Sequence, residues 1–318
     1  MIHFCTLFDQ RYATRGIAML ESLHETMSRP FNVTVLAMDR VVPGMLAKIG
    51  RPEWKVVEVA NLGDKQFAEL EKTRPHREFC WTAAPVLAHR MTEAAREGDL
   101  VVYVDADLFF YGDPVQLTDE LGVDGSILIH EHRYSPDRVQ YEATSGRFNV
   151  GFVAFRVGDE ARRCASRWRQ QVFEKCELDP DNGYCGDQGY LNEWPALYPG
   201  LRIISNIGGG AAPWNLTAYR VTGEPERPSV NGVPVVFFHY HAFRSLYVEH
   251  LGFVAARPAY GYRFSSLANR LLFSLYASRL RTLTAAAHAA GYDLHADERI
   301  GARQAARGWL ANEIILAY

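Results

Sequence analysis

The stretch YVDADLFFYGDP (103–114) constrains the fold most, because two carboxylates interrupt a strongly apolar segment. The apolar run LVVYV (100–104) follows a turn-forming Gly-Asp pair and predicts a short buried strand. Side chains alternate along a strand, so Asp105 and Asp107 can point the same way from its carboxyl end. Neighbouring carboxylates repel each other unless a cation lies between them, and divalent cations take oxygen ligands. The pair therefore predicts a metal site.

The composition is typical of a globular chain. The 318 residues are 48% hydrophobic and 12% aromatic, which is enough for one large core or two modest ones. A net charge of −3 without a block of Lys or Arg argues against a nucleic-acid partner. No stretch approaches the roughly 18 apolar residues of a membrane span, and residues 1–12 lack the pattern of a signal peptide. We therefore expect a soluble, cytoplasmic protein whose five cysteines, which lack CxxC spacing, are reduced.

The first half alternates strand and helix signals, which predicts an α/β sheet flanked by helices. The expected strands are 2–8, 32–38, 54–59, 100–104 and 126–130, and the expected helices lie near 13–27, 43–49, 64–72 and 82–96. In such sheets, ligands bind beyond the carboxyl ends of the strands, where the strand order reverses. Asp105 and Asp107 follow such an end.

The second half is less regular. It predicts strands at 148–155 and 233–241, a helix from 159 to about 176, and loops at 186–195 and 206–215, where substrate contacts concentrate. From about Arg263 the chain reads as helical, with arginines at 270, 279, 281, 303 and 307. Two interpretations of this region stay open: the solvated face of a terminal appendage, or contact with a membrane surface that carries a lipid-linked acceptor.

Six motifs follow one another along the chain: TLFDQRY (6–12), YVDADLFFYGDP (103–114), RFNVGFVAFR (147–156), GDQGYLNEWP (186–195), APWN (212–215) and FFHYHAFR (237–244). In this order the chain resembles the retaining GT-A glycosyltransferases of the glycogenin and bacterial lipopolysaccharide galactosyltransferase type, the family 8-like enzymes. It is most similar to uncharacterised bacterial members found with surface-polysaccharide genes. The resemblance implies a Rossmann-like GT-A catalytic domain over 1–250, with a nucleotide-binding half (1–130) and an acceptor and sugar half (131–250). A C-terminal helical extension (251–318) completes the expected organisation.

The resemblance also implies an activity. It is a metal-dependent transfer of a hexose from a nucleotide-diphosphate sugar, with a UDP-sugar favoured, to a saccharide or lipid-linked glycan in surface-polysaccharide synthesis. The expected location is the cytoplasm or the inner face of the membrane. Breaking the bond between sugar and diphosphate leaves negative charge on the departing oxygens, and Mn²⁺ or Mg²⁺ would act there as a Lewis acid.

The metal ligands follow from the resemblance. Asp105 would contact the nucleotide ribose and the metal, and Asp107 would coordinate the metal. The third ligand would be His239 or His241. Alternation places both histidines on one face of a strand, so the sequence leaves the choice open, although the family's single histidine aligns better with His239.

Further donor contacts are implied by position in the motifs. Thr6, Asp9 and Tyr12 match the residues that meet the base and ribose, and Tyr12 offers a ring for stacking. Burial of Tyr12 in the core is the alternative. Trp214 and Asn215 belong to the expected donor-binding loop.

Asn149, Asp187 and Gln188 match positions that line the sugar and the reaction centre. Asp187 or Gln188 would lie beside the anomeric carbon, opposite the leaving group. An N-cap of a helix is the alternative role for Asp187. Retention of configuration is implied by the resemblance alone, and an inverting enzyme would use a carboxylate such as Asp187 as its base.

The chain departs from the family pattern at two places. Better-known members hold the diphosphate with a Lys after a His and a Gly, whereas this chain has Ala242 near the Gly position and Arg244 as the nearest cation. Arginine can bind phosphate with two hydrogen bonds, so the role can persist. The helix before the DxD strand has Ala84 and Val86 where members carry a basic residue, which leaves phosphate contacts from that helix in question.

Three other functions compete with this one. A non-catalytic nucleotide-sugar-binding or scaffold protein would keep the same fold. A sugar nucleotidyltransferase needs a basic, Gly-rich loop after its first strand, and residues 6–16 (TLFDQRYATRG) are poor in Gly. A DxD phosphatase would carry its motif on the first strand, whereas here about 100 residues of α/β pattern precede it.

Overall fold

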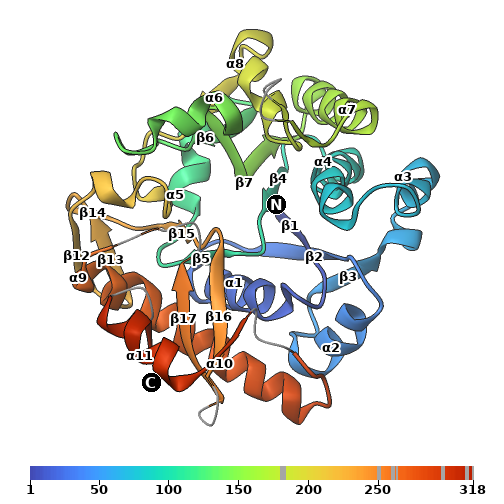
Figure 1. The fold of residues 1–318 in the computed structure, drawn as a ribbon. Coiled ribbons are helices and arrows are strands. Elements are labelled where there is room, and N and C mark those ends of the chain that lie inside the picture. The colour runs from blue at the N-terminus through green and yellow to red at the C-terminus, as the bar shows by residue number, and fades with distance from the viewer. Residues whose placement is uncertain are drawn as a thin grey trace.

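The computed structural model describes residues 1–179, 184–248, 252–258, 262, 264–294, 298–311 and 315–316. Its centre is a seven-stranded mixed sheet in the order β10-β6-β7-β4-β1-β2-β3 (Figure 1). These strands are β1 (Ile2–Phe8), β2 (Phe31–Ala37), β3 (Lys55–Glu58), β4 (Leu100–Val104), β6 (Ile127–Glu131), β7 (Phe148–Arg156) and β10 (Leu201–Ile203). The larger helices are α1 (Ala13–Thr26), α2 (Val41–Ile49), α3 (Lys65–Leu70), α4 (His76–Ala94), α7 (Asp159–Glu174), α10 (Ser274–Ala289) and α11 (Ala302–Leu310).

The strand order reverses between β1 and β4. From β1 the chain proceeds through parallel strands to β2 and β3, and it then returns to β4 on the other side of β1. Strand β7 runs antiparallel to both β4 and β6, which makes the sheet mixed. The helices that diverge from such a reversal leave a crevice at the carboxyl ends of β1 and β4.

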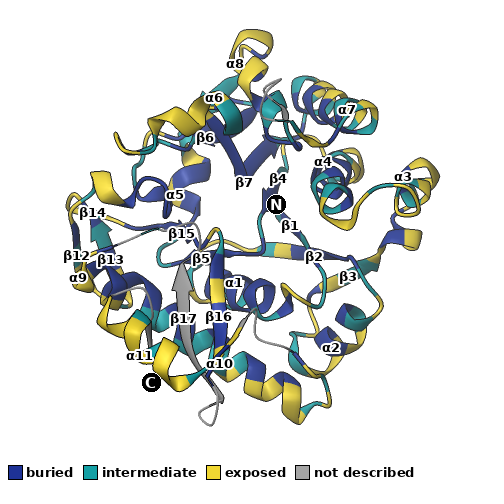
Figure 2. Cartoon of the chain, viewed as in Figure 1, coloured by how far each residue is buried: buried dark blue, intermediate teal, exposed yellow. Residues whose placement is uncertain are grey.

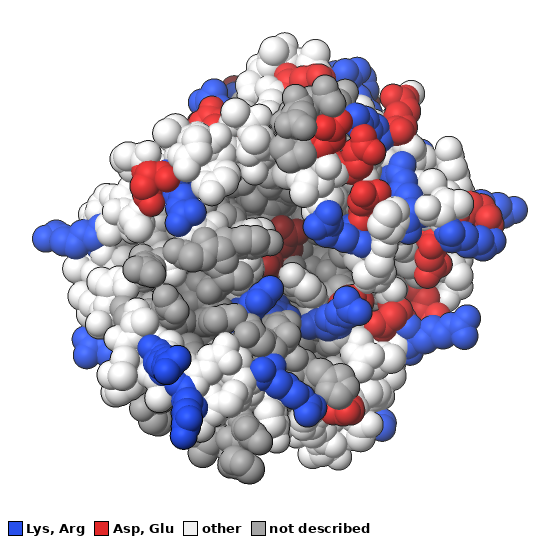
Figure 3. Space-filling view, viewed as in Figure 1, with Lys and Arg blue, Asp and Glu red and all other residues white. Residues whose placement is uncertain are grey.

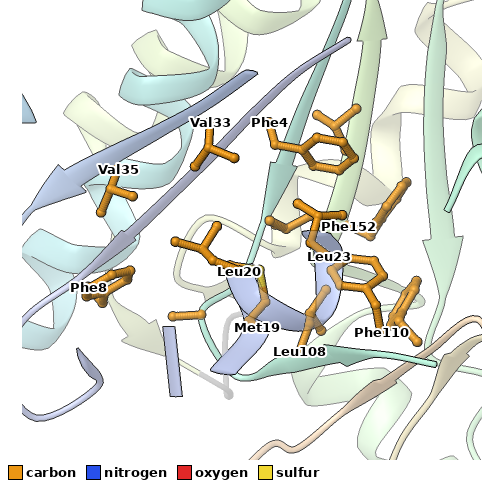
Figure 4. Close-up of a cluster of buried hydrophobic side chains, with 14 of the residues drawn as sticks. Phe4, Phe8, Met19, Leu20, Leu23, Val33, Val35, Leu108, Phe110 and Phe152 are labelled. Atoms are coloured by element: carbon orange, nitrogen blue, oxygen red, sulfur yellow. The ribbon is translucent and has the colours of Figure 1, made fainter. Parts of the chain in front are cut away.

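Side chains of the central sheet alternate between its two faces and pack into two hydrophobic cores. Phe4 and Val102 belong to the core on the side of α1, whereas Cys5 and Tyr103 belong to the core on the side of α4 and α7. Figure 4 shows the α1 side, where Leu20 and other residues of the helix pack against strand residues. In Figure 2 the strands are mostly buried and the outer faces of the helices are exposed.

A smaller sheet joins two of the motifs. It has the order β11-β15-β5, built from β11 (Gly209–Ala211), β15 (Phe237–His239) and β5 (Leu108–Phe110). β15 pairs antiparallel with β5, and His239 lies opposite Leu108. The end of the DxD motif and the first histidine are therefore neighbours, although about 130 residues separate them along the chain.

Two expectations need correction. The strand predicted at 233–241 is divided into β14 (Val233–Pro234) and β15, so His241 lies in the turn after β15. Pro234 has no N–H for a sheet ladder, which favours this break. The C-terminal region contains α10 and α11 as expected, after a hairpin of β16 (Phe243–Val248) and β17 (Gly252–Pro258). Beyond Arg263, however, it also contains the short strands β18 (Glu298–Ile300) and β19 (Ile315–Leu316). The region is therefore not helical throughout.

Within the described residues, no helix has both the length and the apolar character needed to cross a membrane. All five cysteines are free thiols, as the sequence predicts.

Candidate active site

Asp105 and Asp107 lie in the turn that joins β4 to β5, at the reversal of strand order. The Tyr103 hydroxyl donates a hydrogen bond of 2.9 Å to Oδ1 of Asp105. Burial and the nearby charge of Asp107 raise the pKa of Asp105 to about 6, while His239 and the Tyr103 hydrogen bond oppose the rise. Tyr103, which the sequence analysis did not assign, thus orients the first acid of the motif.

His239 faces both acids. Its Nε2 lies 3.1 Å from Oδ1 of Asp107 and 3.8 Å from Oδ2 of Asp105. Burial alone would raise the pKa of Asp107, but the charge of His239 and its hydrogen bond hold that pKa at about 2. Against the effect of burial, the two carboxylates in turn raise the pKa of His239, so its imidazole lies where a cation would balance both acids.

The same side chains fit a divalent metal. Among the described residues, Asp107, His239 and His241 form a group whose ligand atoms all lie within 4.8 Å of one another. Two ligands on opposite sides of a metal are about 4.2 Å apart, because each bond is about 2.1 Å, so the three side chains would need to move only slightly to hold an ion. Carboxylate and imidazole together suit Mn²⁺ better than Mg²⁺, which prefers oxygen. His239 is buried and His241 is exposed, and the structure brings both to Asp107.

Gly151 leaves the space that this arrangement needs. A Cβ at residue 151 would lie 2.8 Å from Nδ1 of His239 and 2.7 Å from Oδ1 of Asn149, closer than real side chains approach. The backbone of Gly151 also accepts the N–H of Asp105 at 3.0 Å. Glycine in the motif RFNVGFVAFR is thus explained by the close approach of β7 to the histidine.

Asn149 and Gln188 form a buried network. Asn149 Nδ2 donates to Oε1 of Gln188 at 2.8 Å and lies 3.2 Å from Nε2 of His132. Gln188 Nε2 donates to the carbonyl of Ser145 at 2.7 Å. Burial lowers the pKa of His132 to about 3, so its ring is neutral and Nε2 can accept. Both ends of the Gln188 amide are therefore held by the protein.

Asp187 lies beside this network and is 5% exposed. Burial and the charge of Asp105 raise the pKa of Asp187 well above its usual value. The 3₁₀-helix Gly189–Glu193 has Gln188 at its N-cap, without a side-chain capping bond. The alternative of Asp187 as an N-cap is therefore wrong.

The residues of the first motif differ in accessibility. Thr6 is fully buried, and its Oγ1 has no partner in the described part of the chain. Asp9 accepts the backbone N–H groups of Arg11 and Tyr12 at 2.9 and 3.1 Å, and its other oxygen lies 2.9 Å from Nε2 of His76. Asp9 thus shapes the turn that leads from β1 into α1.

Tyr12 is 43% exposed, so the alternative of a core residue is wrong. The guanidinium of Arg15 lies 4.8 Å from the centre of its ring. Arg15 is 5% exposed, donates to the carbonyl of Phe243 at 3.1 Å and lowers the pKa of Asp107. This buried cation was missed by the sequence analysis, because one arginine in a helix pattern carries no signal of its burial.

Trp214 packs against both histidines. Its ring centre lies 5.1 Å from that of His239 and 5.5 Å from that of His241, and its Nε1 donates to the carbonyl of His132 at 2.9 Å. Asn215 is fully buried. Its Nδ2 donates to the carbonyls of His132 and Gly210, and its Oδ1 accepts the N–H of Ala212. Asn215 shapes the loop that contains it, whereas Trp214 borders the histidines.

The residues that depart from the family pattern also have defined places. Ala242 has a positive φ of 57°, a conformation that favours glycine. Arg244 is exposed on β16, three residues beyond His241. Ala84 and Val86 are buried in α4, and both side chains are uncharged. At these two positions the helix therefore offers no cation to a phosphate. Figure 3 shows a hollow at the centre of this face, with acidic side chains inside it and basic side chains at its margin.

Two curated proteins are similar to this chain in sequence. No family model matches the chain. The uncharacterized protein YfnD of Bacillus subtilis (strain 168) is 29% identical over 243 residues, which is 76% of this chain and 78% of YfnD. The uncharacterized protein YfnF of the same strain is 27% identical over 255 residues, 78% of this chain and 84% of YfnF.

Among solved structures, the galactosyltransferase LgtC in complex with donor and acceptor sugar analogs is similar to this chain. The TM-score is 0.50 and the sequence identity 19%, over 75% of this chain and 87% of LgtC. This likeness shows the fold. The GT-A fold that the motifs implied is confirmed, with a central mixed sheet flanked by helices and a C-terminal helix.

Proposed function

We propose that the protein is a metal-dependent glycosyltransferase. It moves a hexose from a nucleotide-diphosphate sugar, with a UDP-sugar favoured, to a saccharide in the synthesis of a bacterial surface polysaccharide. One observation carries the proposal: the Asp107, His239 and His241 ligand atoms converge beside Asp105 at the strand reversal of a GT-A fold. Ligands bind at such reversals. The sugar analogs bound to the similar LgtC support a donor and an acceptor for this chain.

The residues around the crevice would have different roles in binding the donor. Asp105, Asp107, His239 and His241 would hold Mn²⁺, which supplies Lewis acidity toward the departing diphosphate. Tyr12 would offer an exposed ring to the base, and Arg244 would bind phosphate oxygens. Thr6, Asp9, Trp214 and Asn215 would shape the walls of the donor site, since most of their polar groups are buried or bonded within the protein.

The reaction centre would lie near Asp187. Its carboxyl is close enough to Asp105 for the charge of Asp105 to raise its pKa, and on losing its proton it would stabilise positive charge on the sugar ring. Gln188 and Asn149 would hold the wall of this site, because their amides bond each other and the backbone. We propose retention of configuration, which the resemblance supports.

The first prediction concerns the donor. In a thermal-shift screen of UDP-, GDP- and dTDP-hexoses with Mn²⁺, a UDP-sugar at about 100 times its Kd is expected to stabilise the protein by about 2.7 kcal/mol. For a chain of this length, that free energy corresponds to a rise in Tm of about 4 °C. The rise should vanish with EDTA. Release of nucleoside diphosphate in the same mixture distinguishes an enzyme from a scaffold, and stabilisation without release for all donors and acceptors would favour the scaffold.

We also propose peripheral contact with a membrane through α11. Trp309 and Leu310 are 54% and 78% exposed, and Arg303 and Arg307 are exposed one turn apart on the same helix (Figure 2). Residues 251–318 contain eight arginines, no lysine and four acidic residues, whereas the whole chain has a net charge of −3. Exposed apolar side chains beside cations are the pattern of a helix that lies on anionic lipid.

The second prediction tests this contact. The double variant Trp309→Ala/Leu310→Ala is expected to weaken binding to vesicles that contain anionic lipid by at least about tenfold, because two large apolar side chains are lost. Cosedimentation measures the binding. Leu197→Ala is the matched control, since Leu197 is also exposed, at 45%, but lies on a different helix. Equal binding of the double variant and the native chain would contradict membrane contact through α11.

A further inference from the structure

The C-terminal region touches the back of the metal-binding strand. Tyr240 lies between His239 and His241, and its ring is buried on the opposite side from theirs, in the core that contains α10. It stacks on Tyr276 of α10 with ring centres 3.7 Å apart and planes at 12°. The backbone N–H of Tyr240 donates to the carbonyl of Asp107 at 2.8 Å. One residue therefore joins both histidines and the DxD turn to α10.

A second tyrosine reaches the same place. Tyr111 follows β5, and its hydroxyl donates to the carbonyl of Leu272 at 3.0 Å. The Tyr240 hydroxyl contacts both the Tyr111 hydroxyl and the same carbonyl. A carbonyl oxygen has two lone pairs, so one backbone group can serve both side chains. Leu272 lies in the π-helical segment Asn269–Phe273, and such segments are frequent at functional sites.

The helix that follows is fixed to the body of the protein. Arg279 pairs with Glu25 of α1 at 2.9 Å. Near its end, the Lys48 ammonium of α2 donates to the carbonyl of Ala290 at 2.9 Å. The Leu272 carbonyl is thus part of an element that packs along the helices beneath the sheet, rather than part of a loop tip (Figure 1).

We infer that Tyr111 and Tyr240 are positioning residues, which hold the strands of the metal ligands in place through the Leu272 carbonyl. The inference rests on the proposed function, because the metal site is part of that proposal. Asp107 precedes β5, whereas Tyr111 follows it, and the two histidines flank Tyr240. A shift of either tyrosine moves the backbone that carries the ligand atoms. The C-terminal region would then tune metal affinity without contributing a ligand.

The test is a Mn²⁺ titration of the full-length protein. Binding is followed by quenching of the fluorescence of Trp214, whose ring lies beside both histidines, and a Trp214→Phe protein identifies the signal. Tyr240→Phe removes only the hydroxyl and is expected to raise the Kd for Mn²⁺ about tenfold, as loss of a group that orients a ligand does. Tyr111→Phe is expected to act in the same direction, and it serves as the second variant if Tyr240→Phe does not fold.

Tyr276→Phe is the matched control. Its buried hydroxyl has no partner among the described residues, so its removal is expected to leave the Kd unchanged. Urea unfolding of each variant separates positioning from stability, since a merely structural tyrosine would lower the unfolding midpoint and leave the Kd unchanged. If the native protein binds Mn²⁺ and the Tyr240→Phe and Tyr111→Phe proteins bind it equally well, the inference is overturned and the proposed function stands. If the native protein shows no Mn²⁺ quenching, the proposed metal site and the inference both fall.

Discussion

Replacement of Asp107 by asparagine is expected to lower metal-dependent turnover about a thousandfold. The substitution keeps the shape of the side chain but removes the charge that faces His239 at 3.1 Å. Loss of an outer partner of a metal ligand already costs about 10- to 100-fold in affinity or activity, and loss of a ligand is expected to cost more. The measurement is release of nucleoside diphosphate as a function of Mn²⁺ concentration.

The fold should survive this change. Asp107 lies in a turn beyond β4, and after its neutral replacement His239 still faces Asp105 at 3.8 Å, so neither group is left as an unpaired buried charge. The control is Asp119→Asn, which removes an acid of the same kind from an exposed ion pair with Arg29. Exposed pairs of this type contribute about 0–1 kcal/mol. Near-native turnover of the Asp107 variant, with an unchanged requirement for Mn²⁺, would refute the proposed metal chemistry.

Much of the central sheet was predictable because its signals are local. The apolar run 100–104 is β4 to the residue, and the strand predicted at 148–155 differs from β7 by one residue. The pairing of β5 with β15 was not predictable, because it joins segments that are far apart and have three residues each. Helix α4 begins at His76, six residues before the predicted start. The prediction missed these residues because they do not show the apolar periodicity of a helix.

The residues of the candidate site also divide into those with a local sequence signal and those placed by contacts between distant segments. Asp105, Asp107 and His239 stand in motifs that carry their own chemical signal, and the structure brings them together. Arg15 and His132 carry no such signal, since their place near the acids or near Asn149 results from packing between distant elements. The two histidines could not be separated by sequence, and the structure explains why: both reach Asp107, one from β15 and one from the following turn.

Replacement of Asp187 by asparagine is expected to have opposite effects on stability and on activity. The folded protein holds the pKa of this carboxyl well above its usual value, through burial and the charge of Asp105. Above pH 4 the Asp187 carboxyl loses its proton in the unfolded chain but keeps it in the folded chain. The native carboxyl therefore destabilises the fold. Asparagine removes this effect, and the free energy of unfolding at pH 7 is expected to rise by more than about 1 kcal/mol. The gain should vanish below pH 4, where both states are protonated.

Turnover of the same variant is expected to fall about 100- to 1,000-fold, because asparagine cannot give up a proton and become negative as positive charge develops on the sugar in the transition state. Gln188→Met is the matched comparison. It leaves the amide of Asn149 without its 2.8 Å acceptor and is expected to cost about 1–3 kcal/mol of stability. A gain in stability with a loss of turnover would identify Asp187 as a residue kept for the reaction, whereas unchanged turnover would exclude it. Proton NMR of the product then assigns its role, since an inverted anomeric signal would make Asp187 the base and end the proposal of retention.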